Sequence, residues 1–174
     1  MNKFLTKSME KIFNTLGSNL DEFKDKTILI TGANGLIGGF LSEFFMYLND
    51  EHDFNSKLVL TSLSDDPKRL GNLIYRKDVQ YYSRDLTNDS WFFDEIDFCI
   101  YCAGYAQPNK FLSDAEKTYQ LNVDAMVRTF QSVMFERKKS KMLFISSSEV
   151  YALNDITKPH CETDELKLDL WHKR

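Results

Sequence analysis

The sequence predicts an α/β domain built on a doubly wound parallel sheet. Short apolar, β-branched runs alternate along the chain with segments whose apolar residues recur at helical spacing, which is typical of βαβ units. A glycine-rich turn separates the first of these runs from the helical segment after it. The length of 174 residues suits one compact domain with a core of its own.

The predicted elements follow from periodicity, taken here in chain order. Residues 3–17 carry apolar side chains near helical spacing and end at Gly17, which predicts an amphipathic N-terminal helix. Residues 36–48 repeat apolar positions at i, i+1, i+4 and i+5, which form one face of a helix. Further helices are expected at 66–75 and 114–137, with a weaker one near 89–94. About five strands are expected, at 26–31, 57–62, 79–82, 97–102 and 141–146.

The composition is that of a globular protein and argues against several kinds of partner. With 43% hydrophobic and 14% aromatic residues, the chain has enough apolar surface to fold. A net charge of −4 provides no basic surface for nucleic acid or an anionic membrane. No stretch approaches the roughly 18 apolar residues of a membrane span, and charges interrupt the first apolar stretch, so no signal peptide is predicted. We therefore expect a cytoplasmic protein with no nucleic-acid or membrane partner.

Cys99 and Cys102 have the C-x-x-C spacing of some metal and redox sites. Both lie on a predicted strand, where residues i and i+3 point to opposite faces, so we expect two buried, inert thiols instead. His52, His160 and His172 are scattered without ligand spacing and are expected to be exposed. No metal site is predicted.

Three glycines form a G-x-x-G-x-x-G pattern between a predicted strand and a predicted helix. The first allows a tight turn, the second permits close approach of a diphosphate, and the third lets the helix pack against the strand. The helix N-terminus then offers free N–H groups and the positive end of its dipole. No Lys-Ser/Thr pair follows, which disfavours a Walker-type loop. We expect a dinucleotide to be bound by Gly32, Asn34, Gly35, Leu36, Ile37 and Gly38.

The segment from Thr31 to Gly38 resembles the cofactor loop of the extended short-chain dehydrogenase/reductases, the NAD-dependent epimerase/dehydratase family, which modifies nucleotide-linked sugars. Four further segments follow in the family order: Asp85-Leu86, Tyr101-Cys102-Ala103-Gly104, Leu121-Asn122-Val123 and Ser146-Ser147-Ser148-Glu149-Val150-Tyr151. Ala152 replaces the usual glycine. The resemblance implies a Rossmann fold, with a helical extension at 1–20 and an NAD(P)-binding domain at 21–174.

The resemblance also implies which residues contact the cofactor beyond the glycine loop. Asp85 and Leu86 correspond to the segment that contacts the adenine ring, and Asn122 to the family's Asn-Val element. The nicotinamide side corresponds to Cys102, Ala103 and Gly104. Taken alone, Asp85 fits a cap of the following segment better, and Asn122 a packing residue within a helix.

The choice between NAD and NADP rests on the end of the second predicted strand. That strand ends in the hydroxyl residues Thr61, Ser62 and Ser64, not in the carboxylate that often holds the ribose 2′-OH. Asp65 and Asp66 come slightly late, and Lys68 and Arg69 fit a solvated surface as well as a 2′-phosphate. The family favours NAD, and NADP stays open.

The family mechanism implies hydride transfer from sugar C4, followed by elimination, decarboxylation or return of the hydride. By position, Ser147 corresponds to the residue that hydrogen-bonds the C4 hydroxyl. Glu149 corresponds to a catalytic Glu of the dehydratases and decarboxylases, which implies a proton-transfer role or a contact with the sugar. Ser148 stands where 4,6-dehydratases carry Asp, which moves the resemblance toward the decarboxylases. We expect Ser148 and Gln107 to contact substrate, although a hydroxyl-rich turn and a plain surface loop are the alternatives.

The Tyr-x-x-x-Lys pair that provides the family's base is missing, because no tyrosine follows Tyr151. We expect a truncated chain that is inactive alone, whose full-length enzyme acts on a UDP- or dTDP-linked sugar. The helix at 114–137 resembles half of the family's dimer interface, which implies a homodimer. The alternatives are a non-catalytic dinucleotide-binding or interaction module and a non-sugar short-chain reductase.

Overall fold

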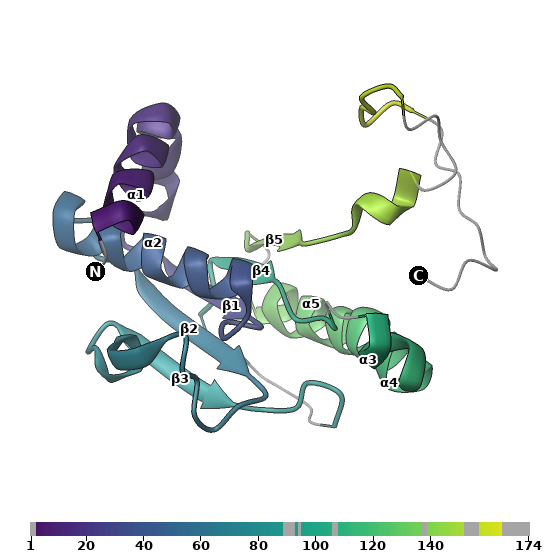
Figure 1. Cartoon of the computed structure of the whole chain (residues 1–174). Coiled ribbons are helices and arrows are strands. Elements are labelled where there is room, and N and C mark those ends of the chain that lie inside the picture. Colours follow the sequence, from purple (N-terminus) through teal and green to yellow (C-terminus); the bar gives the residue numbers. More distant parts are fainter. Residues whose placement is uncertain are drawn as a thin grey trace.

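The computed structural model describes residues 3–88, 93, 95–105, 108–136, 139–151 and 157–164. Its centre is a five-stranded parallel sheet in the order β3-β2-β1-β4-β5, with helices on both faces (Figure 1). The strands are β1 (Thr27–Thr31), β2 (Lys57–Ser62), β3 (Val79–Ser83), β4 (Phe98–Tyr101) and β5 (Lys141–Phe144). The predicted doubly wound α/β fold is therefore confirmed.

The strand order reverses at β1. From β1 the chain builds outward through β2 and β3, then crosses back to β4 and β5 on the other side. The last residue of β1, Thr31, pairs with Thr61 of β2 and with Tyr101 of β4. Ligands of open parallel sheets bind outside the carboxyl ends of the strands at such a reversal, so this edge is where a site is expected.

The helices are α1 (Lys3–Leu16), α2 (Leu36–His52), α3 (Pro108–Ser113), α4 (Ala115–Tyr119) and α5 (Ala125–Glu136). Alternate residues of β1 face opposite layers: Ile28 and Ile30 pack in the cluster that contains α2, whereas Leu29 packs in the cluster of α5. Both clusters are buried, as the period of two in a strand requires. The buried faces of α2 and α5 thus hold the sheet between them.

Helix α1 packs on the same core as α2. Met9 has no exposed surface, and the ring of Phe13 stacks on His52 at 3.6 Å between centroids. The predicted exposure of His52 is therefore wrong, because α1 covers it. His160 is half-buried as well, stacked on Tyr151. The division of the chain near residue 20 stays a prediction.

Two predicted helices are corrected by the structure. Within 66–75 only Gly71–Tyr75 is helical, as a short 3-10 helix, because Gly71 adopts a left-handed φ of 49° and its N–H bonds back to the carbonyl of Pro67. The range 114–137 is divided into α4, a π-helical turn at Gln120–Asp124, and α5. Most of 89–94 lies outside the described residues.

Burial also sets the state of the two neighbouring cysteines. Cys99 is buried, as predicted, and burial raises the pKa of its thiol to about 12. Cys102 is only half-buried, and burial raises its pKa to about 11. Both thiols are therefore protonated at neutral pH and unreactive as nucleophiles.

Candidate functional site

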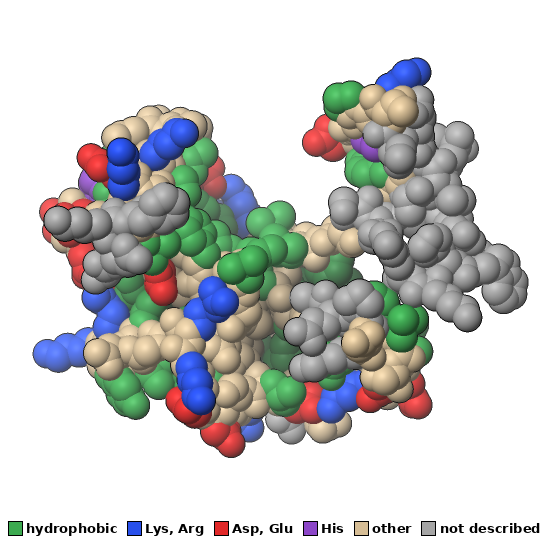
Figure 2. Space-filling view, viewed as in Figure 1, with side chains coloured by type: hydrophobic (Ala, Val, Ile, Leu, Met, Phe, Trp, Pro, Cys, Tyr) green, Lys and Arg blue, Asp and Glu red, His purple; other side chains and the backbone are tan. Residues whose placement is uncertain are grey.

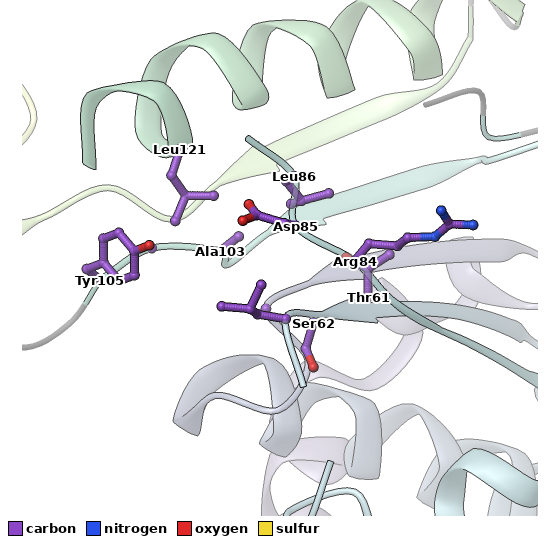
Figure 3. A pocket seen from close by; sticks show the side chains of 11 residues that line it. Thr61, Ser62, Arg84, Asp85, Leu86, Ala103, Tyr105 and Leu121 are labelled. Carbon is purple, nitrogen blue, oxygen red and sulfur yellow. The ribbon is translucent and has the colours of Figure 1, made fainter. Parts of the chain in front are cut away.

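A cleft of about 130 Å³ opens at the carboxyl ends of β1 to β4 (Figure 3). It lies where the strand order reverses. Five of the predicted cofactor residues contribute to its lining, which consists of Gly32, Thr61, Ser62, Leu63, Arg84, Asp85, Leu86, Ala103, Gly104, Tyr105 and Leu121. The sequence motifs after β1, β3 and β4 thus converge on one cavity.

The glycine loop is packed too tightly for side chains. Gly32 has a φ of 64°, and a Cβ there would lie 2.8 Å from the carbonyl oxygen of Cys102. A Cβ on Gly38 would lie 2.5 Å from the carbonyl oxygen of Gly32, and one on Gly35 3.0 Å from the same atom. The first and third glycines therefore serve the close contacts between loop, helix and β4 that the pattern predicts.

Helix α2 begins directly at this loop. Gly35 is its N-cap, and no side chain among the described residues caps the helix there. The first-turn N–H groups of a 17-residue helix, with its positive dipole end, therefore face the loop without a carboxylate or hydroxyl partner. This arrangement fits the diphosphate of a dinucleotide.

Asn34 serves the loop itself. Its side-chain oxygen accepts a hydrogen bond from the backbone N–H of Arg69 at 3.1 Å, which ties the glycine loop to the segment after β2. The neighbouring side chains of Leu36 and Ile37 are exposed, by 73% and 49%. Contact of these three residues with a cofactor stays a prediction.

Thr31, the residue before the glycines, is a positioning residue that the sequence interpretation missed. Its buried hydroxyl accepts hydrogen bonds from the backbone N–H groups of Cys102 and Ala103, both at 3.1 Å. The end of β4 is thereby held against the start of the glycine loop. Its place at the head of the glycine pattern is the only sequence signal for this role.

The carboxylate of Asp85 accepts four hydrogen bonds. Oδ1 accepts from the backbone N–H of Thr87 at 3.0 Å and from its hydroxyl at 2.7 Å. Oδ2 accepts from Lys117 Nζ at 2.9 Å and from the Asn88 amide at 3.3 Å. Burial by itself raises the pKa of Asp85, but the hydrogen bonds from Thr87 and Lys117 outweigh it and hold the pKa below its ordinary value. Asp85 thus caps the turn after β3. This is the capping role that the sequence offered as the alternative to an adenine contact.

The helices beyond β4 hold this turn in place. Arg128 on α5 donates from Nη2 to the backbone oxygens of Leu86 and Thr87, at 3.0 and 3.2 Å. Lys117 reaches Asp85 from α4, with side-chain exposures of 34% and 21%. Sequence reasoning missed both cations, because each lies more than 30 residues from its partner and belongs to none of the motifs.

The π-helical turn brings Leu121 to the cleft and Asn122 beside Gly104. Tyr101 donates its hydroxyl to the backbone oxygen of Leu121 at 2.6 Å, and burial raises the pKa of that phenol. A Cβ on Gly104 would lie 3.4 Å from the side-chain oxygen of Asn122. The predicted nicotinamide segment and the Asn-Val element are therefore neighbours.

At the end of β2, the hydroxyl of Ser62 is used within the turn, whereas that of Thr61 is not. Ser62 bonds to the hydroxyl of Tyr81 at 2.6 Å, and Tyr81 in turn donates to the carbonyl of Ser64. Thr61 has a buried hydroxyl with no hydrogen-bond partner in the described part of the chain. The guanidinium of Arg84 points away from the cleft in Figure 3. No carboxylate therefore lines this side of the cleft among the described residues.

The segment after β5 is not part of the cleft. Ile145 continues the pairing with β4 through its N–H to the carbonyl of Tyr101, at 3.1 Å, and 148–151 then form a 3-10 turn. In Figure 1 this turn lies away from the sheet, and Ser147, although described, does not line the cavity. The contacts expected of Ser148 and Glu149 depend on side chains that the structure does not describe. Gln107 lies outside the described residues altogether.

The described residues hold no cluster of three or more His, Cys, Asp or Glu side chains that would bind a metal ion. Within that same part of the chain, no helix is both long and apolar enough to span a bilayer. Figure 2 shows Lys and Arg side chains interspersed with Asp and Glu on the visible face.

Comparison with known proteins agrees with this geometry. The family model for the NAD dependent epimerase/dehydratase family matches residues 28–169. No curated protein sequence matches the chain significantly.

Three solved structures show the same fold. A UDP-N-acetylglucosamine 4-epimerase from Methanobrevibacter ruminantium M1, in complex with UDP-N-acetylmuramic acid, is 23% identical with a TM-score of 0.65 over 83% of this chain and 45% of its own. The UDP-Glc/GlcNAc 4-epimerase from Campylobacter jejuni is 16% identical with a TM-score of 0.64, and the match covers 83% of this chain and 44% of that one. The enzyme WbmF from Bordetella bronchiseptica, in complex with NAD+ and UDP, is 13% identical with a TM-score of 0.56. The match covers 71% of this chain and 36% of that one.

The chain spans less than half the length of each of these structures. The family match covers most of the chain itself, from the start of β1 to beyond the segment after β5. The chain belongs to the NAD-dependent epimerase/dehydratase family.

Proposed function

We propose that this chain binds NAD across the carboxyl edge of its sheet and contributes the cofactor-binding part of a nucleotide-sugar enzyme. The observation that carries the proposal is the convergence of three elements on one cleft: the uncapped N-terminus of α2, the turn at Asp85 and Leu86, and the end of β4 at Ala103 and Gly104. The first fits a diphosphate, the second an adenine and the third a nicotinamide ring.

When bound, NAD supplies a hydride acceptor. The sugar nucleotides in the structural relatives are UDP-linked, which supports a UDP- or dTDP-linked sugar as substrate and oxidation at C4 as the first step. In this proposal Ser147 hydrogen-bonds the C4 hydroxyl and Glu149 transfers a proton, while Ser148 and Gln107 contact the sugar. The reaction is that of a cytoplasmic epimerase, dehydratase or decarboxylase.

The 174 residues contain no Tyr-x-x-x-Lys pair, so they include no phenolate to accept the hydroxyl proton. We therefore expect this polypeptide to bind the cofactor without turning over a sugar nucleotide.

A homodimer through α4, the π-helical turn and α5 is part of the proposal. Their side chains Tyr119, Val123, Val127 and Phe130 are spaced along one stripe and are between 37% and 59% exposed. An apolar stripe of this kind is typical of helix pairing.

The test is binding of NAD and NADP to the purified chain by calorimetry, together with the shift in melting temperature. NAD is expected to bind and stabilise the chain, more strongly than NADP does. Gly35→Val is expected to abolish the shift by blocking the diphosphate. Gly17→Ala adds a Cβ in open space at a left-handed φ of 52°, so it is expected to lower the melting temperature of the free chain but to keep the shift. An unchanged shift in Gly35→Val would reject the loop as the diphosphate site.

A further inference from the structure

The acceptor capacity of Asp85 is already used within the protein. An ionised carboxylate has about four lone-pair positions, two on each oxygen. In this structure four donors fill them: the N–H and hydroxyl of Thr87, the ammonium of Lys117 and the amide of Asn88. An adenine amino group would be a fifth donor.

Lys117 is the one charged donor of these four. Its ammonium lies 2.9 Å from Oδ2, and a charge-assisted hydrogen bond is roughly twice as strong as one from a neutral amine. The pair is partly shielded from solvent, with side-chain exposures of 34% for Lys117 and 21% for Asp85. A neutral amino group on a ligand therefore competes poorly for this oxygen.

The backbone of Lys117 is fixed where it stands. Its N–H donates to the side chain of Asp114, the N-cap of α4, at 3.0 Å. The ammonium thus approaches Asp85 from an anchored helix start.

The backbone N–H of Leu86 is a second group near the cleft that could bind an adenine ring. The carbonyl of Leu86 accepts from Arg128, but its N–H has no hydrogen-bond partner in the described part of the chain, and the residue lines the cleft. A backbone N–H beside the cavity matches the N1 acceptor of an adenine ring.

We propose that Lys117 withholds the carboxylate of Asp85 from the adenine amino group, so that this chain recognises adenine through the N–H of Leu86 alone. The inference rests on the proposed cofactor site and reassigns one of its residues. Lys117 becomes a specificity-determining residue, because it decides whether the 6-amino group is read. Asp85 becomes a positioning residue that shapes the turn.

The test compares NAD with an analogue in which hydrogen replaces the 6-amino group of the purine and N1 remains an acceptor. Affinities are measured by calorimetry on the wild-type chain, and the wild type is expected to bind both within about threefold. In Lys117→Met, which removes the donor and shortens the unbranched side chain by one atom, Oδ2 gains a vacant acceptor position. That variant is expected to prefer NAD by about tenfold or more, the usual effect of a hydrogen bond to a charged group.

Two matched variants serve as controls. Lys117→Arg keeps a cation beside Asp85 and is expected to behave as the wild type. Lys24→Met removes a surface ion pair of 2.8 Å with Asp21, outside the cleft, and is expected to leave both affinities unchanged. The hypoxanthine dinucleotide, whose N1 carries a proton, is expected to bind weakly to every variant because it cannot accept from Leu86.

The outcomes separate this inference from the proposed function. If the wild type prefers NAD tenfold over the purine analogue, Asp85 reads the amino group and the inference is overturned while the cofactor site stands. A Lys117→Met chain that gains no preference overturns it as well. Binding of neither dinucleotide to a folded wild type would reject the cofactor site itself.

Discussion

The hydroxyl of Thr31 accepts a hydrogen bond from the backbone N–H of Ala103, 72 residues later in the chain, at 3.1 Å. A second bond at the same distance comes from the N–H of Cys102. One side chain at the end of β1 thus positions the end of β4, and with it one wall of the cleft. Strands β1 and β4 are therefore connected by these two side-chain hydrogen bonds in addition to their backbone pairing.

Replacing the buried Thr31 by valine is expected to destabilise the chain by about 2–4 kcal/mol, because two partly buried N–H groups lose their acceptor at nearly constant side-chain volume. Urea unfolding measures the effect. Thr31→Ser keeps the hydroxyl and is expected to retain most of the stability. Equal losses in both variants would mean that the methyl group, and not the hydrogen bonds, matters at this position.

Adding one methyl group at Gly38 is expected to destabilise the chain severely, because the new Cβ would lie 2.5 Å from the backbone oxygen of Gly32. Gly104→Ala is the matched control, because its Cβ would meet the side chain of Asn122 at an ordinary 3.4 Å. Melting temperatures of the two variants provide the comparison. A Gly38→Ala chain as stable as Gly104→Ala would contradict the close packing of α2 on the glycine loop.

Truncating Met9 to alanine is expected to cost about 2–4 kcal/mol, since the side chain is fully buried between α1 and the main cluster. Leu16→Ala on the same helix, where the side chain is 40% exposed, is expected to cost far less. Chemical denaturation of both distinguishes a helix that belongs to the core from one that merely precedes it. A small effect at Met9 would argue for the latter.

The pKa of Asp78 is held below its ordinary value, first by hydrogen bonds from Arg76 and then by one from Asn49, against the opposing effect of burial. Because the folded pKa is the lower one, the contribution to stability is present above the ordinary value of about 3.9 and is lost as the pH falls through the folded pKa. Asp78→Asn is expected to lose stability at neutral pH and to show a flatter decline in acid.

The measurement is the free energy of unfolding of wild type and Asp78→Asn between about pH 7 and pH 2. Asp65→Asn, at an exposed carboxylate, is the control and is expected to follow the wild-type curve. Parallel curves for wild type and Asp78→Asn would show that the contacts with Arg76 contribute nothing to the acid dependence.

Local sequence signals predicted the strands within a few residues, because buried parallel strands are short apolar runs with clear limits. They failed at 66–75, where Pro67 and a left-handed Gly71 make a turn and a short 3-10 helix out of a helical pattern. They also missed the π-helical turn at Gln120–Asp124, since the apolar spacing of one wide turn differs little from that of an α-helix.

The motifs of the candidate site could be recognised because each is a local pattern with its own chemistry. The sequence alone determined the α/β fold class, the glycine loop before α2 and the family resemblance that orders the segments along the chain. Only the tertiary structure decided that Thr31 holds the end of β4, that Arg128 holds the turn after β3, and that Lys117 donates to the carboxylate of Asp85. The reason is physical: backbone conformation follows from neighbours in sequence, whereas the hydrogen bonds that fill a carboxylate come from whichever donors the fold brings within about 3 Å.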